Sequence, residues 1–148
     1  MPCVAGRQIY KYTNIFYMEL GISNEQAQQL IDEYISDNIT RMHLLETEAI
    51  MRALAKHFGE NEDEWGMVGL LHDIDWDLTK DNEKEHGNKM PEILRKAGGT
   101  DFLVETIESH IYGHELNERF KDKQRQGNLQ HALAAAETVT GFRGGFRL

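Results

Sequence analysis

The chain of 148 residues has a single cysteine, Cys3, so it cannot form an intramolecular disulfide. Only two prolines occur, Pro2 and Pro91, and no β-branched run alternates with polar residues. No window approaches the about 18 to 20 apolar residues of a membrane-spanning helix, and residues 1–20 are too polar for a signal peptide. These absences predict a cytoplasmic, all-α protein without a membrane partner.

The composition is acidic. The chain has 25 Asp and Glu against 16 Lys and Arg, a formal net charge of -9. This charge works against binding to a nucleic-acid polymer or an anionic membrane, although a metal-bound or locally basic pocket can still attract a small anion. With 40% hydrophobic residues, the chain can bury one core. We therefore expect one domain, as a monomer or homodimer, that acts on a small molecule.

Helical periodicity extends over most of the chain, and it predicts about six helices. Ser23 with Gln26 forms a capping box, Thr40 can cap a second helix, and Gly59 can end it. The predicted helices cover residues 23–37, 40–58, 61–72, 82–96 and 100–114, and the last begins at 129. Pro91 is expected to bend or restart the helix over 82–96. Loops are expected over 75–80 and 115–128. The domain spans 23–142, residues 1–22 are an unassigned N-terminal arm, and 143–148 form a C-terminal tail.

Five of the seven histidines lie on or beside the apolar stripes of different predicted helices. Each one alone is more often a hydrogen-bonded core residue than a metal ligand. Five together would be costly to bury, at about 1 to 3 kcal/mol for each unsatisfied group. A divalent cation relieves this cost because imidazole and carboxylate are its natural ligands. The five are His43, His72, His86, His110 and His114.

The stretch GLLHDIDWD, residues 69–77, adds a carboxylate beside one of these histidines. Adjacent helix positions diverge by about 100°, so His72 and Asp73 cannot point the same way. A carboxylate has two oxygens, so Asp73 could share one metal with His72 and bridge to a second. The dipeptide alone is equally compatible with a solvated helix end.

These residues in their order resemble the HD-domain superfamily of metal-dependent phosphohydrolases, especially its small single-domain predicted hydrolases. The resemblance covers residues 24–142 and rests on His43, on His72 and Asp73 in GLLHDID, on His86 in EKEHG, on His110 in ESH, and on AAETVTGF. It implies a helical HD-type bundle. It also implies one or two divalent metal ions per chain (Mn, Mg, Co, Fe, Zn or Ni).

Carried over by position, the resemblance implies that His43, His72 and Asp73 hold a first metal, completed by a late acidic residue. That position has Glu137 where the family has aspartate. His86 and His110 match the additional ligands of members with two metals, with Asp73 as the bridge. A second departure is that many relatives read HDIGK, whereas this chain reads HDIDW and has its next lysine at Lys80.

Other residues are candidates for catalysis and substrate binding. Asp75 and Asp77 join Asp73 as candidate acid, base or water-orienting groups, although each could instead cap or solvate a turn. Arg119 and Lys123, in the only basic cluster, could bind phosphate if their loop covers the pocket; otherwise they are solvated. His114 could be a ligand, a substrate contact or a surface residue.

The leading hypothesis is a phosphohydrolase for a small phosphorylated substrate, plausibly a nucleotide, that works by attack of metal-bound hydroxide. A second hypothesis is a non-catalytic metal- or nucleotide-binding regulatory module, which Glu137, the missing HDIGK lysine and the short C-terminal segment favour. A third is a diiron oxygenase on the same scaffold, which His86 and His110 would permit.

Overall fold

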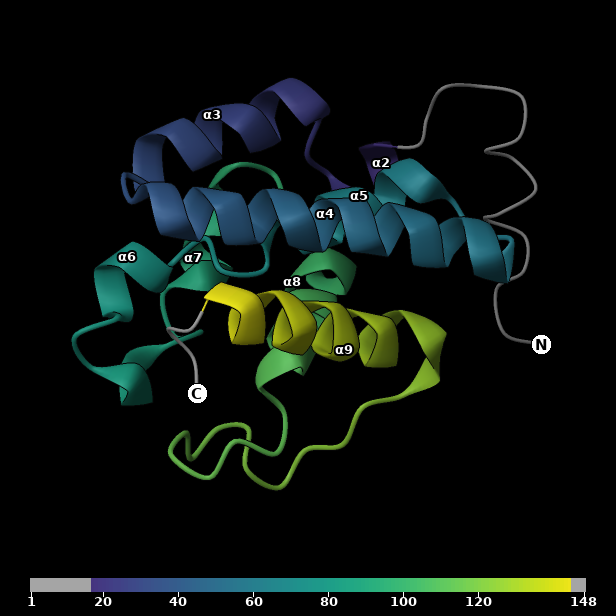
Figure 1. Ribbon diagram of the computed structural model, residues 1–148. Helices are drawn as coiled ribbons and strands as arrows, with labels where there is room; N and C mark the ends of the chain where they lie inside the picture. Colours follow the sequence, from purple (N-terminus) through teal and green to yellow (C-terminus); the bar gives the residue numbers. More distant parts are fainter. Residues whose placement is uncertain (1–16, 145–148) are drawn as a thin grey trace.

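A computed structural model describes residues 17–144 of the chain (Figure 1). The described residues form helices, turns and loops, with no strand, so the all-α prediction is confirmed. None of the described helices is both long and apolar enough to cross a membrane. The helices are α2 (Tyr17–Leu20), α3 (Asn24–Tyr34), α4 (Asn38–Phe58), α5 (Glu62–Leu71), α6 (Trp76–Thr79), α7 (Met90–Lys96), α8 (Asp101–Glu108) and α9 (Gly127–Gly144), with 3-10 turns η1 (Glu83–Glu85) and η2 (Ser109–Ile111).

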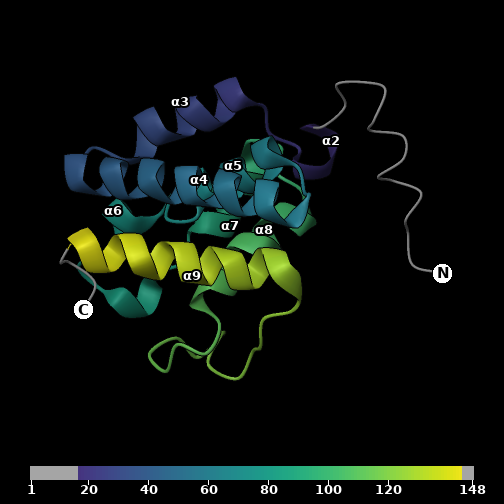
Figure 2. The ribbon, with the colours of Figure 1, turned by 45° about the vertical axis from the view of Figure 1, so that its right-hand side comes forward.

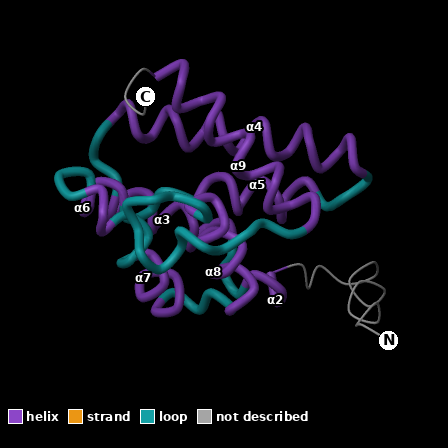
Figure 3. Tube along the Cα trace, turned by 90° about the horizontal axis from the view of Figure 1, so that it is seen from below, coloured by secondary structure: helices purple, strands orange, loops and turns teal. Residues whose placement is uncertain are grey.

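Helix α5 lies at the centre of the bundle. Every residue from Trp65 to Leu71 is buried, and α5 packs against α3, α4, α8 and α9. Helices α4 and α9 run side by side (Figure 2). Viewed from below, α4 and α9 lie on one side of α5, and α2, α7 and α8 lie on the other (Figure 3). The core therefore surrounds α5 and the turn that follows it.

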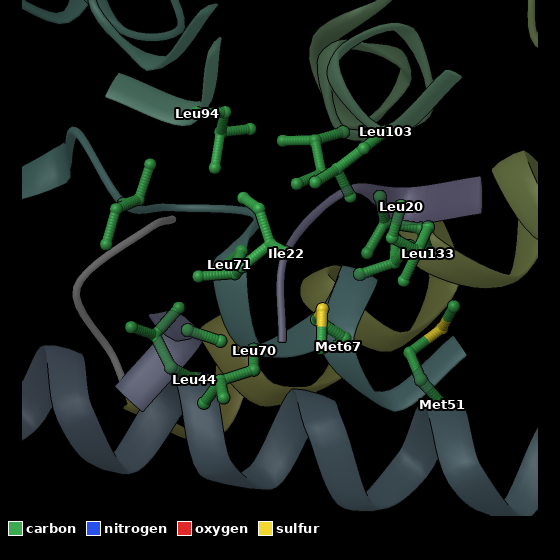
Figure 4. Packing of buried hydrophobic residues seen from close by; sticks show 14 of the residues in the cluster. Leu20, Ile22, Leu44, Met51, Met67, Leu70, Leu71, Leu94, Leu103 and Leu133 are labelled. Atoms are coloured by element: carbon green, nitrogen blue, oxygen red, sulfur yellow. The ribbon is translucent and has the colours of Figure 1, made fainter. Parts of the chain in front are cut away.

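The buried apolar side chains come from nearly all of these helices. Met51 of α4, Met67 and Leu71 of α5, Leu94 of α7 and Leu103 of α8 point into one cluster (Figure 4). Leu20 and Ile22, which precede the predicted domain boundary at residue 23, are fully buried in the same cluster (Figure 4). The described end of the N-terminal arm is thus part of the core. Residues 1–16 and most of the predicted tail lie outside the described residues.

Several predicted helix ends are confirmed. The Ser23 hydroxyl accepts from the Gln26 backbone N–H, and the Gln26 side chain accepts from the Ser23 N–H, as a capping box requires. Asn61 caps α5, and Gly59 ends α4. The predicted Thr40 cap is wrong. Asp37 caps α4 instead, accepting from the backbone N–H and the hydroxyl of Thr40, and Thr40 is buried inside the helix.

The predicted helix over 82–96 is wrong in its first half. Residues 83–85 form only a 3-10 turn, Gly87 has φ of +85°, and α7 begins at Met90 with Pro91 in its first turn. Proline suits that position because the N–H that it lacks has no helical partner there. The predicted loop over 75–80 contains the short helix α6. The predicted helix over 100–114 ends as α8 and η2, so His114 lies in the following loop.

Gly69 brings α5 close to α4. A Cβ at this position would lie 2.9 Å from Met51 Cγ and 3.0 Å from the backbone oxygen of Thr47. We expect Gly69→Ala to lower the free energy of unfolding by about 1 to 3 kcal/mol, because backbone cannot move aside easily. Chemical denaturation measures this loss.

Gly66, one turn earlier in α5, provides the matched control. The three atoms nearest to a Cβ there all belong to the flexible side chain of Arg52, at 2.7 to 2.8 Å, and none is backbone. Gly66→Ala should be neutral or stabilising because alanine has a helix propensity about 1 kcal/mol more favourable than glycine. Equal losses in the two variants would contradict the close-approach argument.

Candidate metal centre

Four histidines from different parts of the chain surround the carboxylate of Asp73. His43 comes from α4 and His72 from the end of α5; His86 follows η1, and His110 lies in η2. Asp73 has 0% exposure. The described residues contain two groups of metal-capable side chains, and Asp73 belongs to both.

We call His43, His72 and Asp73 Oδ2 the inner group. Its Nε2 atoms are 3.0 Å apart, and each lies 3.1 Å from Asp73 Oδ2. We call His86, His110 and Asp73 Oδ1 the outer group. Its Nε2 atoms are 3.2 Å apart, at 3.1 and 3.3 Å from Asp73 Oδ1. Each carboxylate oxygen therefore faces two imidazole nitrogens.

The local structure after α5 explains how adjacent residues both reach the centre. Helix α5 ends at Leu71, and residues 72–75 form turns, with the Ile74 N–H bonded to the Leu71 oxygen and the Trp76 N–H to the Asp73 oxygen. A solvated helix end, the alternative for GLLHDIDWD, is excluded because residues 72–75 are all buried.

The second ring nitrogen of each histidine also has an oxygen nearby. His72 Nδ1 lies 2.7 Å from the Gly69 carbonyl oxygen, and His110 Nδ1 bonds the Ile107 carbonyl oxygen. A carbonyl can only accept, so in both residues Nδ1 carries the proton, and a neutral ring keeps a lone pair on Nε2. This is the usual arrangement for a histidine that binds a metal through Nε2.

The donor set fits a divalent cation in each group. Two ligands about 2.1 Å from one cation lie roughly 3.0 to 3.4 Å apart at right-angle to tetrahedral geometry. The separations of 3.0 to 3.3 Å within both groups match this spacing. Imidazole nitrogen with carboxylate oxygen suits several first-row metals, so the donors do not select one of them.

His72 of the inner group and His86 of the outer group have pKa values shifted in opposite directions. The pKa of His72 is lowered, because the effect of burial is larger than the opposing effect of the nearby Asp73 charge. Burial also acts to lower the pKa of His86, but the nearby carboxylates of Asp73 and Asp75 outweigh it and raise the pKa to about 9. Near neutral pH, His72 is therefore ready to bind a metal, whereas His86 holds a proton that a metal must displace.

The raised pKa of His86 predicts that cation binding to the outer group releases a proton from His86. Below pH 9, the pKa of His86, outer-group affinity should fall by up to about tenfold per pH unit, because each bound cation displaces one proton. Calorimetry in buffers of different ionisation enthalpy counts the protons released. His86→Ala should remove the proton-linked step and keep inner binding, and a proton count of zero in the wild type would contradict the prediction.

Asp75 holds the segment that carries His86. Its Oδ2 accepts from the backbone N–H groups of Gly87, Lys89 and Met90 at 2.9 to 3.2 Å. Its Oδ1 lies 3.2 Å from His86 Nδ1. Asp75 has 0% exposure. The structure thus gives this predicted catalytic residue contacts with the backbone and with a candidate ligand.

The structure does not bring Asp77 or Glu137 into either group. Asp77 Oδ2 accepts from the backbone N–H groups of Ser36 and Asp37, which ties α6 to the loop before α4. Glu137 is half-buried on α9, where its Oε2 accepts from the Thr138 hydroxyl at 3.3 Å. Neither is in the two metal-capable groups of the described residues. Their predicted roles, in catalysis and as a ligand, stay predictions.

The predicted substrate-binding residues lie on the loop between η2 and α9. Arg119 pairs with Glu108 at 3.0 Å and donates to Asn88 Oδ1, two residues after His86. The ammonium group of Lys123 lies 5.3 Å from the Tyr112 ring centroid. His114 is exposed in this loop, so the shared helical face predicted for it and His110 is wrong. Their substrate roles stay predictions.

Two residues contact the candidate metal centre in a way that sequence reasoning did not predict. The Asn117 side chain is buried and donates to the His86 carbonyl oxygen. Arg125 donates to the carbonyl oxygens of His110 and Tyr112. Both side chains bind backbone carbonyl oxygens in the segments that carry His86 and His110. Every residue has such an oxygen, so no residue spacing in the sequence could have indicated these contacts.

Comparisons with known proteins agree with this geometry. A family model described as HD domain matches residues 40–139, more than half of the chain. Ribonuclease Y of Mycoplasma mycoides is 28% identical over 105 residues, which are 71% of this chain and 23% of that protein. Ribonuclease Y of Mycoplasma capricolum subsp. capricolum is 27% identical, over 71% of this chain and 19% of that protein. The chain spans less than a quarter of the length of these relatives. No solved structure matches it.

Proposed function

The chain belongs to the HD domain family, and from this membership we propose that it is a metal-dependent phosphohydrolase for a small phosphorylated substrate. The observation that carries the proposal is the sharing of Asp73 by two groups of paired imidazoles. A divalent cation bound in such a group lowers the pKa of a bound water and polarises a phosphoryl oxygen.

The residues of the chain have separate tasks in this proposal. Asp73 belongs to both groups, and its negative charge would compensate the positive charge of the cations bound there. The His86 side chain is 12% exposed, whereas those of His43 and His72 are at most 1% exposed, so substrate approaches from the outer group. Trp76 borders this approach, with its ring centroid 5.1 Å from that of His86.

A small substrate such as a nucleotide suits the charge of the chain. A net charge of -9 opposes long-range attraction of a polyanion, but not binding of one phosphate group at a cationic centre. Arg119, Lys123 and His114 are the side chains proposed to contact that phosphate. The similarity to proteins named ribonuclease Y makes RNA the alternative substrate to test.

The test is hydrolysis of a panel of nucleotides, other phosphate monoesters and a short RNA by protein purified without chelator. Each substrate is tested with Mn²⁺, Mg²⁺, Co²⁺, Fe²⁺, Zn²⁺ and Ni²⁺, and bound metal is determined by elemental analysis. We expect chelator-sensitive release of phosphate from small substrates. Faster cleavage of RNA would replace the small-substrate proposal with an RNA hydrolase.

Two other outcomes would favour the remaining hypotheses. Tight nucleotide or metal binding without turnover under any metal would favour a regulatory binding module. An iron pair with oxygen-dependent turnover would favour a diiron oxygenase, for which the two groups around Asp73 also supply ligands. Either result would overturn the phosphohydrolase proposal.

A further inference from the structure

Two buried threonines lie directly behind His43. The Thr140 hydroxyl of α9 is 2.9 Å from His43 Nδ1 and 2.9 Å from the Thr47 hydroxyl of α4. Thr47 also donates to the His43 carbonyl oxygen at 2.8 Å. Both threonines are buried, at 0% exposure for Thr47 and 2% for Thr140. Helix α9 therefore contacts the inner group through a hydroxyl.

His43 differs from the other three histidines in the partner of its Nδ1. In His72 and His110 that nitrogen faces a carbonyl oxygen, and in His86 it faces the carboxylate of Asp75. Those oxygens can only accept, so they favour the tautomer with the proton on Nδ1. A hydroxyl can donate or accept, so the Thr140 contact alone leaves the His43 tautomer open.

The surroundings of the two hydroxyls remove this ambiguity. The Thr47 proton goes to the His43 carbonyl oxygen, which leaves lone pairs of Thr47 facing Thr140. The Thr140 proton can go to those lone pairs of Thr47, at 2.9 Å, or to the carbonyl oxygens of Ala136 and Glu137, at 3.0 and 3.1 Å. With its proton directed to one of these acceptors, Thr140 accepts from His43 Nδ1.

We propose that Thr140, supported by Thr47, is a positioning residue that fixes His43 with its proton on Nδ1, so that Nε2 can bind the inner-group cation. This inference rests on the proposed function only in requiring that the inner group binds a cation. Thr140 touches neither the cation nor substrate, and it acts through the orientation and protonation of His43.

The first test measures cation affinity in three variants. Thr140→Val keeps the size of the side chain but removes the hydroxyl, and it should weaken the inner Mn²⁺ or Co²⁺ site by about 10- to 100-fold, as loss of a partner behind a ligand typically does. Thr140→Ser should stay near wild type because it keeps the hydroxyl. Val139→Ala, which shortens an exposed side chain of α9 next to Thr140, is the control and should have no effect. Competition with a chromophoric chelator measures both sites.

The second test observes the proton directly. In the Co²⁺-loaded wild type, histidines that bind through Nε2 should give paramagnetically shifted, solvent-exchangeable Nδ1–H resonances. Thr140→Val should lose one resonance or broaden it by faster exchange, and the outer-group resonances should remain. If Thr140→Val does not fold, Thr47→Val is expected to give the same selective weakening of the inner site.

The outcomes separate this proposal from the proposed function. Wild-type protein that binds no divalent cation would refute both. Wild-type binding of cations together with unchanged affinity and resonances in Thr140→Val would overturn only the role of Thr140. Equal weakening of both sites would indicate general damage and would also overturn that role.

Discussion

Asp73→Asn should abolish cation binding in both groups at once. Asp73 supplies one oxygen to the inner histidines and the other to the outer pair, at 3.1 to 3.3 Å. Asparagine is neutral and has one carbonyl oxygen, so it cannot compensate two cations or bridge them. Because changes behind a ligand already cost about 10- to 100-fold, the proposed hydrolysis should fall by at least about a hundredfold.

Thermal and chemical unfolding give an independent measure of this loss. A cation at 100 times its Kd stabilises the wild type by about 2.7 kcal/mol for each occupied site. In Asp73→Asn this stabilisation should vanish, so added cation should not raise Tm. Asp122→Asn, which changes an exposed aspartate, is the control and should retain the full effect. Cation-dependent stabilisation of normal size in Asp73→Asn would contradict the bridging role.

Asp75→Ala should destabilise the fold and selectively impair the outer group. It removes the acceptor of three backbone N–H groups and the carboxylate beside His86 Nδ1. Each buried donor left without a partner costs about 1 to 3 kcal/mol, so the free energy of unfolding should fall by about 3 kcal/mol or more. Outer-group affinity should fall by about 10- to 100-fold while inner-group affinity stays near wild type.

Urea denaturation of metal-free protein and calorimetric cation titration measure these two effects. The control is Asp81→Ala, an exposed aspartate in the same part of the chain, which should change the unfolding free energy by less than about 0.5 kcal/mol. An Asp75→Ala protein with wild-type stability would refute the backbone-holding role. An equal loss of cation affinity in the inner and outer groups would refute the selective effect of Asp75 on the outer group.

The stretch GLLHDIDWD shows where sequence reasoning ends. The sequence singled out Asp73 as the candidate ligand but did not separate Asp75 from Asp77, whereas the structure gives each of the three a different partner. Asp73 faces the four histidines, Asp75 binds backbone at the start of α7, and Asp77 binds backbone before α4. The partners of Asp75 and Asp77 are N–H groups, which every residue type except proline carries, so no side-chain pattern could reveal them.

Helix ends set by neighbouring residues could be predicted from the sequence, whereas those set by distant contacts could not. Capping by Ser23 and Asn61 depends on neighbours within three residues, so the sequence was enough. The segment over 82–96 was predicted as a helix that Pro91 bends or restarts, and α7 does begin at Met90, but tertiary contacts override the apolar spacing before it. Asp75 binds the N–H groups of Gly87, Lys89 and Met90, which holds the chain in a turn before α7.

By itself, the sequence determined that the protein is helical and that His43, His72, Asp73, His86 and His110 are chemically unusual for an apolar core. Those conclusions follow from periodicity and residue type, which are local properties. Only the tertiary structure decided that these residues meet around one carboxylate, that Glu137 stands outside both groups, and that Thr140 stands behind His43. The physical reason is that hydrogen bonds and ligand distances depend on how the helices pack, and residues as far apart in the sequence as His43 and Thr140 share no local pattern.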